Sequence, residues 1–444
     1  MAKSFNLKKR MTSFQIIILG FAAVVLLGAL LLMLPISTKS GLATPFSEAL
    51  FTSTSAACVT GLVVRDTATH WSAFGQAVIL LLIQIGGMGV VTIAVSFAWL
   101  SGRKISLMQR STMQESITAS KTGGIVRLTG FIVRATLIIE LVGALIMMPM
   151  FCMDFGPKGV WMALFHSVSA FCNAGFDIMG TAEVPFASLT AYTINPAINI
   201  TIMLLIIIGG IGFMTWDDIK VNRQHLKRYS MQSKVILMTS LILIVIPAVY
   251  FYFVEFSGFS ASERVFSSLF QAVSPRTAGF NTTDLTKMTG TGKCLMIMLM
   301  LIGGSPGSTA GGMKTTTVAV LFANAIAVFR RKDDAHFFGR RINDEAVKKA
   351  ATILIMYITL FVSGGLVISL AEKLPIDVCL FETASAIGTV GLSLGLTPGL
   401  GLLSHCILIV LMFLGRVGGL TLVYAALSGA SNISKLPQEK IAVG

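Results

Sequence analysis

The stretch TSTSAACVTGLVVRD, residues 52–66, is a short, mainly apolar segment that leads into a glycine, and the chain contains three more segments of this kind. They are HSVSAFCNAGFDIMG at 166–180, FQAVSPRTAGFNTTD at 270–284 and ETASAIGTVGLSLGL at 382–396. The four segments align on Gly61, Gly175, Gly279 and Gly391, which are 114, 104 and 112 residues apart. This near-constant period indicates one structural unit used four times.

Further features recur around each aligned glycine. A bulky apolar residue stands ten positions before it, at Phe51, Phe165, Leu269 and Phe381. A serine lies between the two, at Ser55, Ser169, Ser274 and Ser385, three of them at the same offset. Each unit also carries a later glycine-rich mark: IQIGGMG at 83–89, IIIGGIG at 206–212, MLIGGSPG at 300–307 and LMFLGRVGG at 411–419. A single such glycine would be explained by a turn or by helix packing, but four aligned copies favour a functional repeat.

The composition is that of a membrane protein, since 54% of the 444 residues are hydrophobic and only 12% are charged. Apolar windows long enough to cross a bilayer lie near 14–34, 74–100, 128–151, 197–216, 234–256, 292–329 (interrupted), 350–371 and 402–427. Shorter runs near 46–58, 160–172, 262–274 and 376–388 fit re-entrant half-helices. We therefore predict an all-α integral membrane fold with eight transmembrane helices and four pore helices around a pseudo-four-fold axis. The predicted units are 1–123, 124–229, 230–345 and 346–444.

The net charge of +14 is distributed in a way that predicts topology, not nucleic-acid binding. Of the 34 Lys and Arg residues, 23 fall in the N-terminal tail, between 103 and 127, between 220 and 234, between 330 and 349, and at Lys435 and Lys440. The positive-inside rule places these regions on the cytoplasmic side of the plasma membrane. Both termini are then cytoplasmic, and the four glycine loops open to the outside.

Four non-helical loops at membrane depth suit a cation pore. Unpaired backbone groups are costly in hydrocarbon and are tolerated where they line a watery path. Rings of backbone carbonyls replace the hydration shell of an alkali cation, and the negative C-terminal ends of short helices favour a positive charge. Glycine permits the required backbone angles, which a Cβ would resist.

The TVGL segment at 389–392 and its three relatives resemble the filter of tetrameric potassium channels, and the whole chain resembles the Trk/Ktr/HKT superfamily of potassium transporters, most closely its Ktr-type membrane subunits. The resemblance implies a potassium-selective filter formed by the carbonyls of four loops. The filter positions are Val59, Thr60 and Gly61; Asn173, Ala174 and Gly175; Thr277, Ala278 and Gly279; Thr389, Val390 and Gly391. It also implies a homodimer, and a cytoplasmic ring of nucleotide-binding regulatory subunits, so that any nucleotide is bound by the partner. The basic loops are compatible with such docking, although the positive-inside bias alone would produce them.

Only the fourth loop keeps the sequence Thr-Val-Gly. We therefore expect one good cation site at the level of the glycines, with fewer stacked sites than in a symmetric channel. The residues indicate a cation pore, and the preference for K⁺ over Na⁺ follows from the resemblance. K⁺ is the substrate and Na⁺ a candidate activator; the sequence predicts no covalent cofactor.

The segment LIGGSPGSTAGGMKTTT, residues 301–317, interrupts an apolar run with five glycines and a proline, so a continuous helix is not expected there. Either this is a kink that only packs, or it is an intramembrane gate at 303–313 beneath the filter, the role that the resemblance implies. The gate residues are Gly303, Gly304, Ser305, Pro306, Gly307, Ser308, Thr309, Ala310, Gly311, Gly312, Lys314 and Arg416. Arg416 stands in an otherwise uncharged segment and requires an interior partner. Lys314 either contacts the loop or extends to the inner surface.

Acidic residues are scarce in the apolar segments. Glu48 and Glu382 are expected near the beginnings of half-helices, where a carboxylate suits the helix dipole. Asp177 and Asn281 follow filter loops, and either attract cations at the outer mouth or are simply solvated.

The sequence also bears on two other function classes. A secondary carrier coupled to Na⁺ or H⁺, working by alternating access, is the alternative to a gated pore, although carriers of that class usually show two repeats. No nucleophile elbow, paired-carboxylate motif or HExxH motif occurs, so the sequence does not indicate an enzyme.

Overall fold

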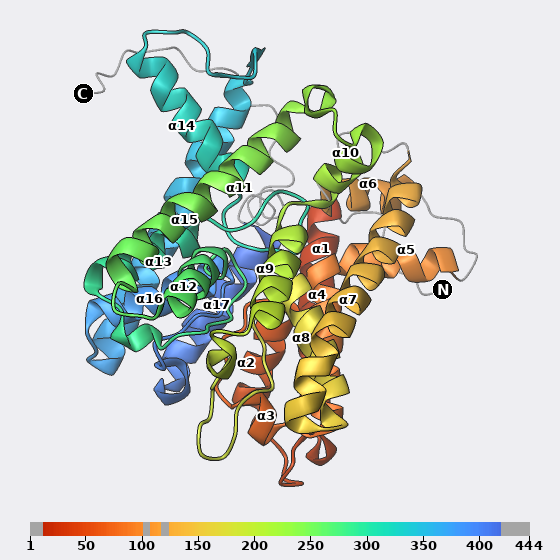
Figure 1. Ribbon diagram of the computed structural model, residues 1–444. Helices are drawn as coiled ribbons and strands as arrows, with labels where there is room; N and C mark the ends of the chain where they lie inside the picture. The colour runs from red at the N-terminus through yellow and green to blue at the C-terminus, as the bar shows by residue number, and fades with distance from the viewer. Residues whose placement is uncertain (1–11, 101–106, 117–123, 419–444) are drawn as a thin grey trace, which may run out of the picture.

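The computed structural model describes residues 12–100, 107–116 and 124–418, and nearly all of their regular secondary structure is helical. The strands among these residues form one small antiparallel hairpin of β1 (His336–Phe337) and β2 (Arg340–Arg341). Figure 1 shows the helices gathered into one bundle, with α10 and α14 toward one end and α2, α8, α12 and α16 in the other half.

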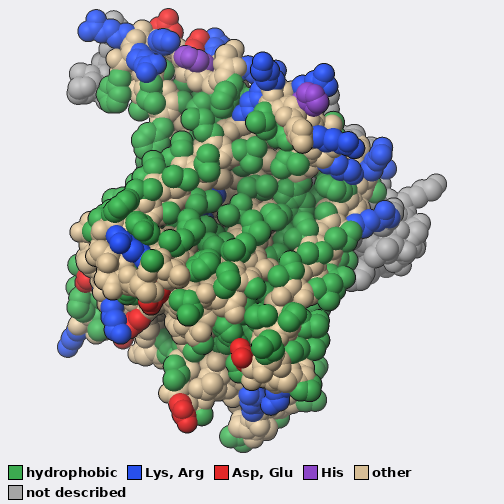
Figure 2. Space-filling model, in the orientation of Figure 1, with side chains coloured by type: hydrophobic (Ala, Val, Ile, Leu, Met, Phe, Trp, Pro, Cys, Tyr) green, Lys and Arg blue, Asp and Glu red, His purple; other side chains and the backbone are tan. Residues whose placement is uncertain are grey.

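One long helix opens each of the four units. These helices are α1 (Ser13–Leu32), α7 (Ile125–Phe155), α11 (Met231–Tyr250) with its π-helical continuation (Phe251–Glu255), and α15 (Asp344–Glu372). The shortest has 20 residues, which is about the length that crosses a hydrocarbon core. One leucine or isoleucine from each, Leu27, Ile138, Leu241 and Leu370, is 61–79% exposed. Figure 2 shows hydrophobic side chains covering the middle of the molecule, and Lys and Arg gathered mainly at one end. The chain is therefore a membrane protein.

The second helix of each of the first three units is interrupted, so the count of eight transmembrane helices stays a prediction. Among the described residues, four helices are long and apolar enough to cross a membrane, or five if the bent pair α9–α10 counts as one. The pieces are α4 (Ala73–Met88) and α5 (Val90–Leu100), α9 (Pro196–Gly210) and α10 (Phe213–Asn222), α13 (Gly290–Leu301) and α14 (Thr315–Phe329), and α17 (Leu402–Val417). The predicted window 402–427 extends beyond the described residues.

The breaks have a common cause in three units. Gly89, Gly212 and Gly418 have φ of 86°, 94° and 85° and ψ of 133°, 141° and 131°. Residues with a Cβ rarely adopt this conformation, so a helix ends before each of these glycines, and after Gly89 and Gly212 a new helix begins. In the bent pair, α9 and α10 meet at 96°.

The predicted half-helices are present as α2 (Phe46–Ala57), α8 (Lys158–Phe171), α12 (Ala261–Val273) and α16 (Ile376–Gly388). Each packs against the long helix that precedes it in the chain. The remaining elements are α3 (Thr67–His70), α6 (Leu107–Ser116) and 3₁₀ turns at Pro35–Ser37, Thr190–Tyr192, Leu226–Arg228, Leu285–Lys287 and Thr397–Gly399. Helix α15, which begins at Asp344, opens the fourth unit.

The buried core surrounds the short helices. Phe51, Phe165 and Phe381 are at most 1% exposed, as their place in the repeat predicts. Leu269 is 38% exposed, and its neighbour Phe270 is fully buried instead. The predicted alignment of the third unit is therefore wrong by one residue, because its segment between the core phenylalanine and the loop glycine is one residue shorter.

Candidate functional site

The four glycine loops meet one another in a closed cycle. A Cβ added to any loop glycine would come within 2.8 Å of the carbonyl oxygen that precedes the glycine of the next loop in the chain. The pairs are Gly61 with Ala174, Gly175 with Ala278, Gly279 with Val390 and, closing the cycle, Gly391 with Thr60. Such an approach is open only to glycine, so the same residue type is needed in all four loops.

The backbone of the four loops follows one pattern. The glycines have φ between 68° and 93°, in the region that L-residues avoid. The residue two positions earlier is also left-handed, although it carries a side chain: Val59, Asn173, Thr277 and Thr389, with φ of 51–74°. Strained residues of this kind persist only where surrounding contacts hold them.

The repeated serines supply those contacts from the ends of the short helices. Ser55 Oγ accepts from the Gly61 N–H at 3.1 Å, and Ser385 Oγ accepts from the Gly391 N–H at 3.0 Å. In the other two units the hydroxyl donates to the carbonyl that follows the glycine: Ser169 bonds Phe176 O at 2.7 Å, and Ser274 bonds Phe280 O. The serine anchors each loop in both arrangements.

Polar side chains lie on the helix side of the cycle. The Asn173 side-chain amide and Thr277 Oγ1 are 3.2 Å apart, and both residues are buried. The hydroxyls of Thr60 and Thr389 are buried and have no hydrogen-bond partner among the described residues. The oxygen atoms of these hydroxyls are therefore free to contact a ligand that has lost its water shell.

The other side of the cycle opens into a cavity of about 370 Å³ that all four loop glycines line. Asp177 and Asn281, which the sequence singled out, both line this cavity. Asp66 and Asp284 line it too, and sequence reasoning missed them. Each stands five residues after its loop glycine, so the repeat itself could have found them. Both also cap local structure: Asp66 accepts from Thr69 N at 2.7 Å, and Asp284 from Thr286 N at 3.0 Å.

The glycine-rich segment of the third unit lies beneath the loops. Residues 302–314 separate α13 from α14, and Ile302 pairs with Met313 as an isolated parallel bridge. A Cβ on Gly311 would collide with Thr389 Oγ1, and one on Gly312 would come within 2.8 Å of Gly388 O. The segment therefore directly abuts the fourth glycine loop.

Hydrogen bonds hold this segment against the second unit. Phe213 N donates to Gly307 O at 2.7 Å, and Ser305 N to Gly210 O at 2.9 Å. Thr309 Oγ1 donates to Phe171 O at 3.0 Å, at the end of α8. The carbonyls of Gly210 and Phe171 and the N–H of Phe213 lie at helix ends, where backbone groups have no partner within their own helix.

Arg416 joins the segment to the first unit. Its guanidinium donates to Thr309 O and to Gly86 O, and to Gly87 O at 3.1 Å. Lys314 Nζ donates to Ala310 O at 2.8 Å and to Gly311 O at 3.3 Å, so this side chain bonds the loop and does not extend away from it. These residues border a second cavity of about 290 Å³, on the side of the segment away from the filter loops.

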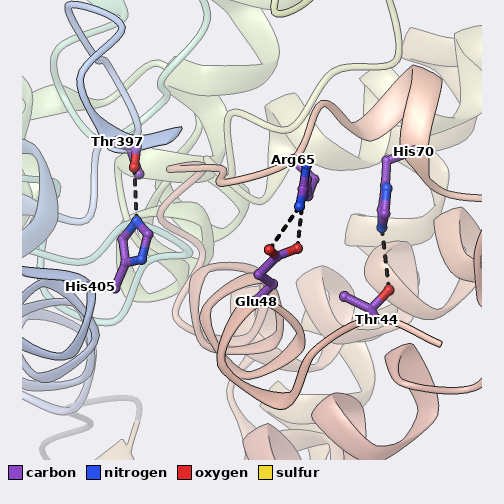
Figure 3. Close-up of polar contacts among 6 residues, drawn as sticks. All are labelled: Thr44, Glu48, Arg65, His70, Thr397 and His405. Carbon is purple, nitrogen blue, oxygen red and sulfur yellow. Dashed lines mark hydrogen bonds and ion pairs between the residues drawn. The ribbon is translucent and has the colours of Figure 1, made fainter. Parts of the chain in front are cut away.

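Figure 3 draws three polar contacts near the cavity that the loop glycines line. Glu48 lies in the first turn of α2, as expected, and binds Arg65 with both oxygens at 2.7 and 2.9 Å. His70 Nε2 lies 3.3 Å from Thr44 Oγ1, and His405 Nε2 lies 2.8 Å from Thr397 O.

Glu382 contradicts its predicted position. It lies in the middle of α16, not at its beginning, and accepts hydrogen bonds from Ser393 Oγ and from Thr397 Oγ1, the latter at 2.9 Å. It therefore ties the extended chain after the fourth loop to its helix.

Comparison with known proteins agrees with this architecture. The family model TrkH, described as cation transport protein, matches residues 3–436. The chain belongs to the TrkH family. Its membership confirms the resemblance seen in the sequence and the expectation that the protein is a transporter and not an enzyme.

Curated relatives of this TrkH-family chain cover nearly its whole length. It is 39% identical to the potassium/sodium uptake protein NtpJ of Enterococcus hirae, with 99% of each chain aligned. It is 38% identical to the Ktr system potassium uptake protein B of Bacillus subtilis, over 98% of this chain and 97% of the relative. The crystal structure of the potassium transporter TrkH from Vibrio parahaemolyticus has the same fold, with a TM-score of 0.74 at 20% identity, covering 95% of this chain and 86% of that one.

Proposed function

We propose that this chain is the pore subunit of a potassium-uptake system, in which K⁺ passes through the cycle of four loops. The observation that carries the proposal is the closure of that cycle. Every loop glycine lies against a carbonyl of the next loop, so all four loops border one axis. Carbonyl oxygens arranged around an axis replace the water that a cation loses on entering.

The carbonyls of Thr60, Ala174, Ala278 and Val390, together with the glycines, form the main ion site. One good site is expected because the layer beneath differs between units: Val59, Asn173, Thr277 and Thr389 present one apolar, one amide and two hydroxyl side chains. K⁺ is the preferred substrate on the strength of the relatives' names, which specify potassium uptake or potassium/sodium uptake. Na⁺ is a candidate activator or competitor.

Residues 303–313 form the gate. The segment abuts Thr389 above and borders the second cavity below, so it lies on the path of an ion that leaves the filter. Arg416 adds a positive charge there and holds the segment through Thr309 O. Opening requires this hydrogen bond to break or the segment to move aside.

The protein works in the plasma membrane as a homodimer, with both termini in the cytoplasm. Lys and Arg gather mainly at the end of the molecule away from the filter loops, the distribution that the positive-inside rule predicts for a cytoplasmic face. A nucleotide-binding regulatory ring docks on that face and controls the gate. The name of the Bacillus relative, protein B of a Ktr system, fits a membrane component that works with others.

A cation-coupled symporter is the alternative function. Flux through proteoliposomes that contain only this chain separates the two. A pore passes K⁺ down its gradient with no H⁺ or Na⁺ moved in a fixed ratio to K⁺, even where Na⁺ changes the rate. A strict requirement for a stoichiometric quantity of H⁺ or Na⁺ would overturn the pore. Empty vesicles and vesicles with an unrelated membrane protein give the baseline.

A further inference from the structure

We propose that a groove at the basic end of the molecule binds the headgroup of an anionic phospholipid. The groove has a volume of about 810 Å³ and lies between α6, α7 and α10. Its charged lining residues are all cationic: Arg110, Arg127, Arg134 and Lys220. In Figure 2, Lys and Arg side chains gather where Figure 1 places the ends of these helices.

The four cations have no anionic partner among the described residues. All four are exposed, and none forms an ion pair or a hydrogen bond with a described side chain. Two other basic residues are paired: Lys349 binds Glu345 at 2.7 Å, and Arg341 binds Asp334 at 3.2 Å. The groove therefore keeps a concentrated positive charge that a phosphate would neutralise.

The backbone adds to this charge. Helix α7 begins after Gly124, which offers no side chain to cap the first turn. The first amides of a long helix and its dipole favour an anion at that end. Lys220 Nζ lies 4.1 Å from the centre of the Phe131 ring, and this contact holds α10 beside α7 and gives the groove its second wall.

The exposed apolar face of α7 next to the groove indicates that the anion is a lipid. Arg127, Phe131 and Arg134 are followed at the same helical spacing by Ile138, Leu141 and Leu145. The last three are 61%, 56% and 52% exposed, so one face of α7 passes from cationic to apolar without interruption. Arg134 lies two turns inside Arg127, about 10 Å along the helix axis. A phosphodiester bound by the arginines would place its acyl chains along the leucines, which a soluble anion cannot use.

Basic clusters between membrane helices bind anionic headgroups, with a contribution of about 1 kcal/mol, or about fivefold in affinity, for each Lys or Arg. Native mass spectrometry of the full chain in neutral detergent, titrated with phosphatidylglycerol and with phosphatidylcholine of the same chains, tests the site. Wild type should retain one phosphatidylglycerol preferentially. The double variant Arg127→Gln/Arg134→Gln should lose about thirtyfold of this preference and bind phosphatidylcholine unchanged.

A charge-matched control uses Lys332→Gln/Arg340→Gln, which removes two exposed cations outside the groove and should leave the preference intact. Arg134→Lys, which keeps the charge, should retain most of it, and equal melting temperatures establish that the variants are folded. Unchanged preference in the groove variant would overturn the proposal. So would displacement of the lipid by millimolar inorganic phosphate, which would indicate a site for a free anion.

The position is tested with a phosphatidylglycerol that carries a photoreactive group on its acyl chain. Labelling should concentrate on residues 131–145, and labelling elsewhere would overturn the assignment to α7. Neither readout uses ion flux, so the result stands apart from the proposed transport function. If the groove instead binds a soluble protein, the double variant should lose that protein while its lipid preference stays unchanged, which again would overturn the proposal.

Discussion

The third unit differs from the other three at both ends of the proposed ion path. Its serine stands five residues before the loop glycine, whereas Ser55, Ser169 and Ser385 stand six before theirs. Its second helix opens into residues 302–314, whereas each of the others breaks at a single glycine. The cycle of loops closes despite this. Ala278 N donates to Ser274 O at 2.9 Å, four residues back, whereas the corresponding N–H group of each other loop donates to the carbonyl of its serine five residues back. Four-fold regularity is thus kept only where the loops must touch each other.

The third unit also differs from the others in what its glycine before the helix break contacts. Gly86, Gly209 and Gly415 each lie against the last carbonyls of their own unit's short helix, at Ala57, Phe171 and Ile387. Their counterpart Gly303 lies against Gly311 O of the gate segment instead. The third unit has replaced a contact with its short helix by a contact within the segment 303–313, which we propose as the gate.

The largest effect is expected from this contact. Gly209→Ala puts a Cβ far inside 3.0 Å of a backbone carbonyl, so the pore helix must shift and the yield of folded protein should fall sharply. Gly303→Ala should fold, because its neighbour belongs to the gate segment. Gly130→Ala on α7, with nothing within 4 Å, is the control. Thermal melting of the purified variants checks the order; equal melting temperatures for Gly209→Ala and Gly130→Ala would contradict it.

The loop glycines should come next. Gly391→Ala and Gly279→Ala, where the approach to the next carbonyl is closest, should reduce the K⁺ over Na⁺ preference by about tenfold or more, since local strain costs about 1–3 kcal/mol. Gly175→Ala, with a carbonyl at 2.8 Å, should be mildest. Gly395→Ala shares the positive φ but has open space around it, and it separates backbone strain from crowding. Competition flux assays measure the order, and a uniform loss that included Gly395→Ala would refute the carbonyl cycle.

Arg416 occupies the position that Gly87, Gly210 and Gly304 occupy in the other units. Arg416→Gly makes the fourth unit like the rest and frees Thr309 O, so K⁺ flux should rise severalfold, about the effect of losing a charged hydrogen bond. Deletion within 304–312 should act in the same direction. Arg416→Lys keeps the positive charge but loses the planar guanidinium that donates to several carbonyls at once, so it should give an intermediate flux. A lower flux from correctly folded Arg416→Gly protein would mean that the arginine only supports the structure.

The loop serines should have smaller and unequal effects. Ser55→Ala leaves the buried Gly61 N–H without its acceptor, while Ser169→Ala leaves a carbonyl under-bonded. An orphaned amide is the rarer and costlier defect, so Ser55→Ala should lower the K⁺ affinity more, by a few-fold for about 1 kcal/mol. Ser72→Ala, at the beginning of α4, is a control outside the loops. Equal affinities in all four proteins would show that the serines do not hold the filter.

The smallest effect concerns the outer mouth. Burial, with a contribution from the Asp66 carboxylate, raises the pKa of Asp177 to about 7. The carboxylate is therefore neutral below pH 7 and charged above it, and a charged group attracts cations to the cavity that it lines. Flux should be about twofold higher at pH 8 than at pH 6 in wild type and flat in Asp177→Asn. The same pH dependence in Asp177→Asn would assign it to another group.

Much of the architecture follows from the sequence because its causes are local. Apolar length predicts the long helices, and the aligned glycines predict the four short helices and the loops between them. The same reasoning failed for Leu269, since the alignment assumed equal spacing and the burial of Phe270 shows that a residue is missing. It also missed the helix ends at Gly89, Gly212 and Gly418. A glycine within a helix and a glycine that ends a helix cannot be told apart from an apolar sequence.

What the sequence determined by itself is periodicity: four units, their apolar segments, and the aligned glycines of the four loops. Only the tertiary structure decided which groups meet. The contact that closes the cycle joins Gly391 to Thr60, residues far apart in the sequence, and Arg416 reaches Gly86 across 330 residues. Local preferences act over a few residues and leave a trace in the sequence, whereas contacts between distant backbone carbonyls leave none, since every residue type has a carbonyl.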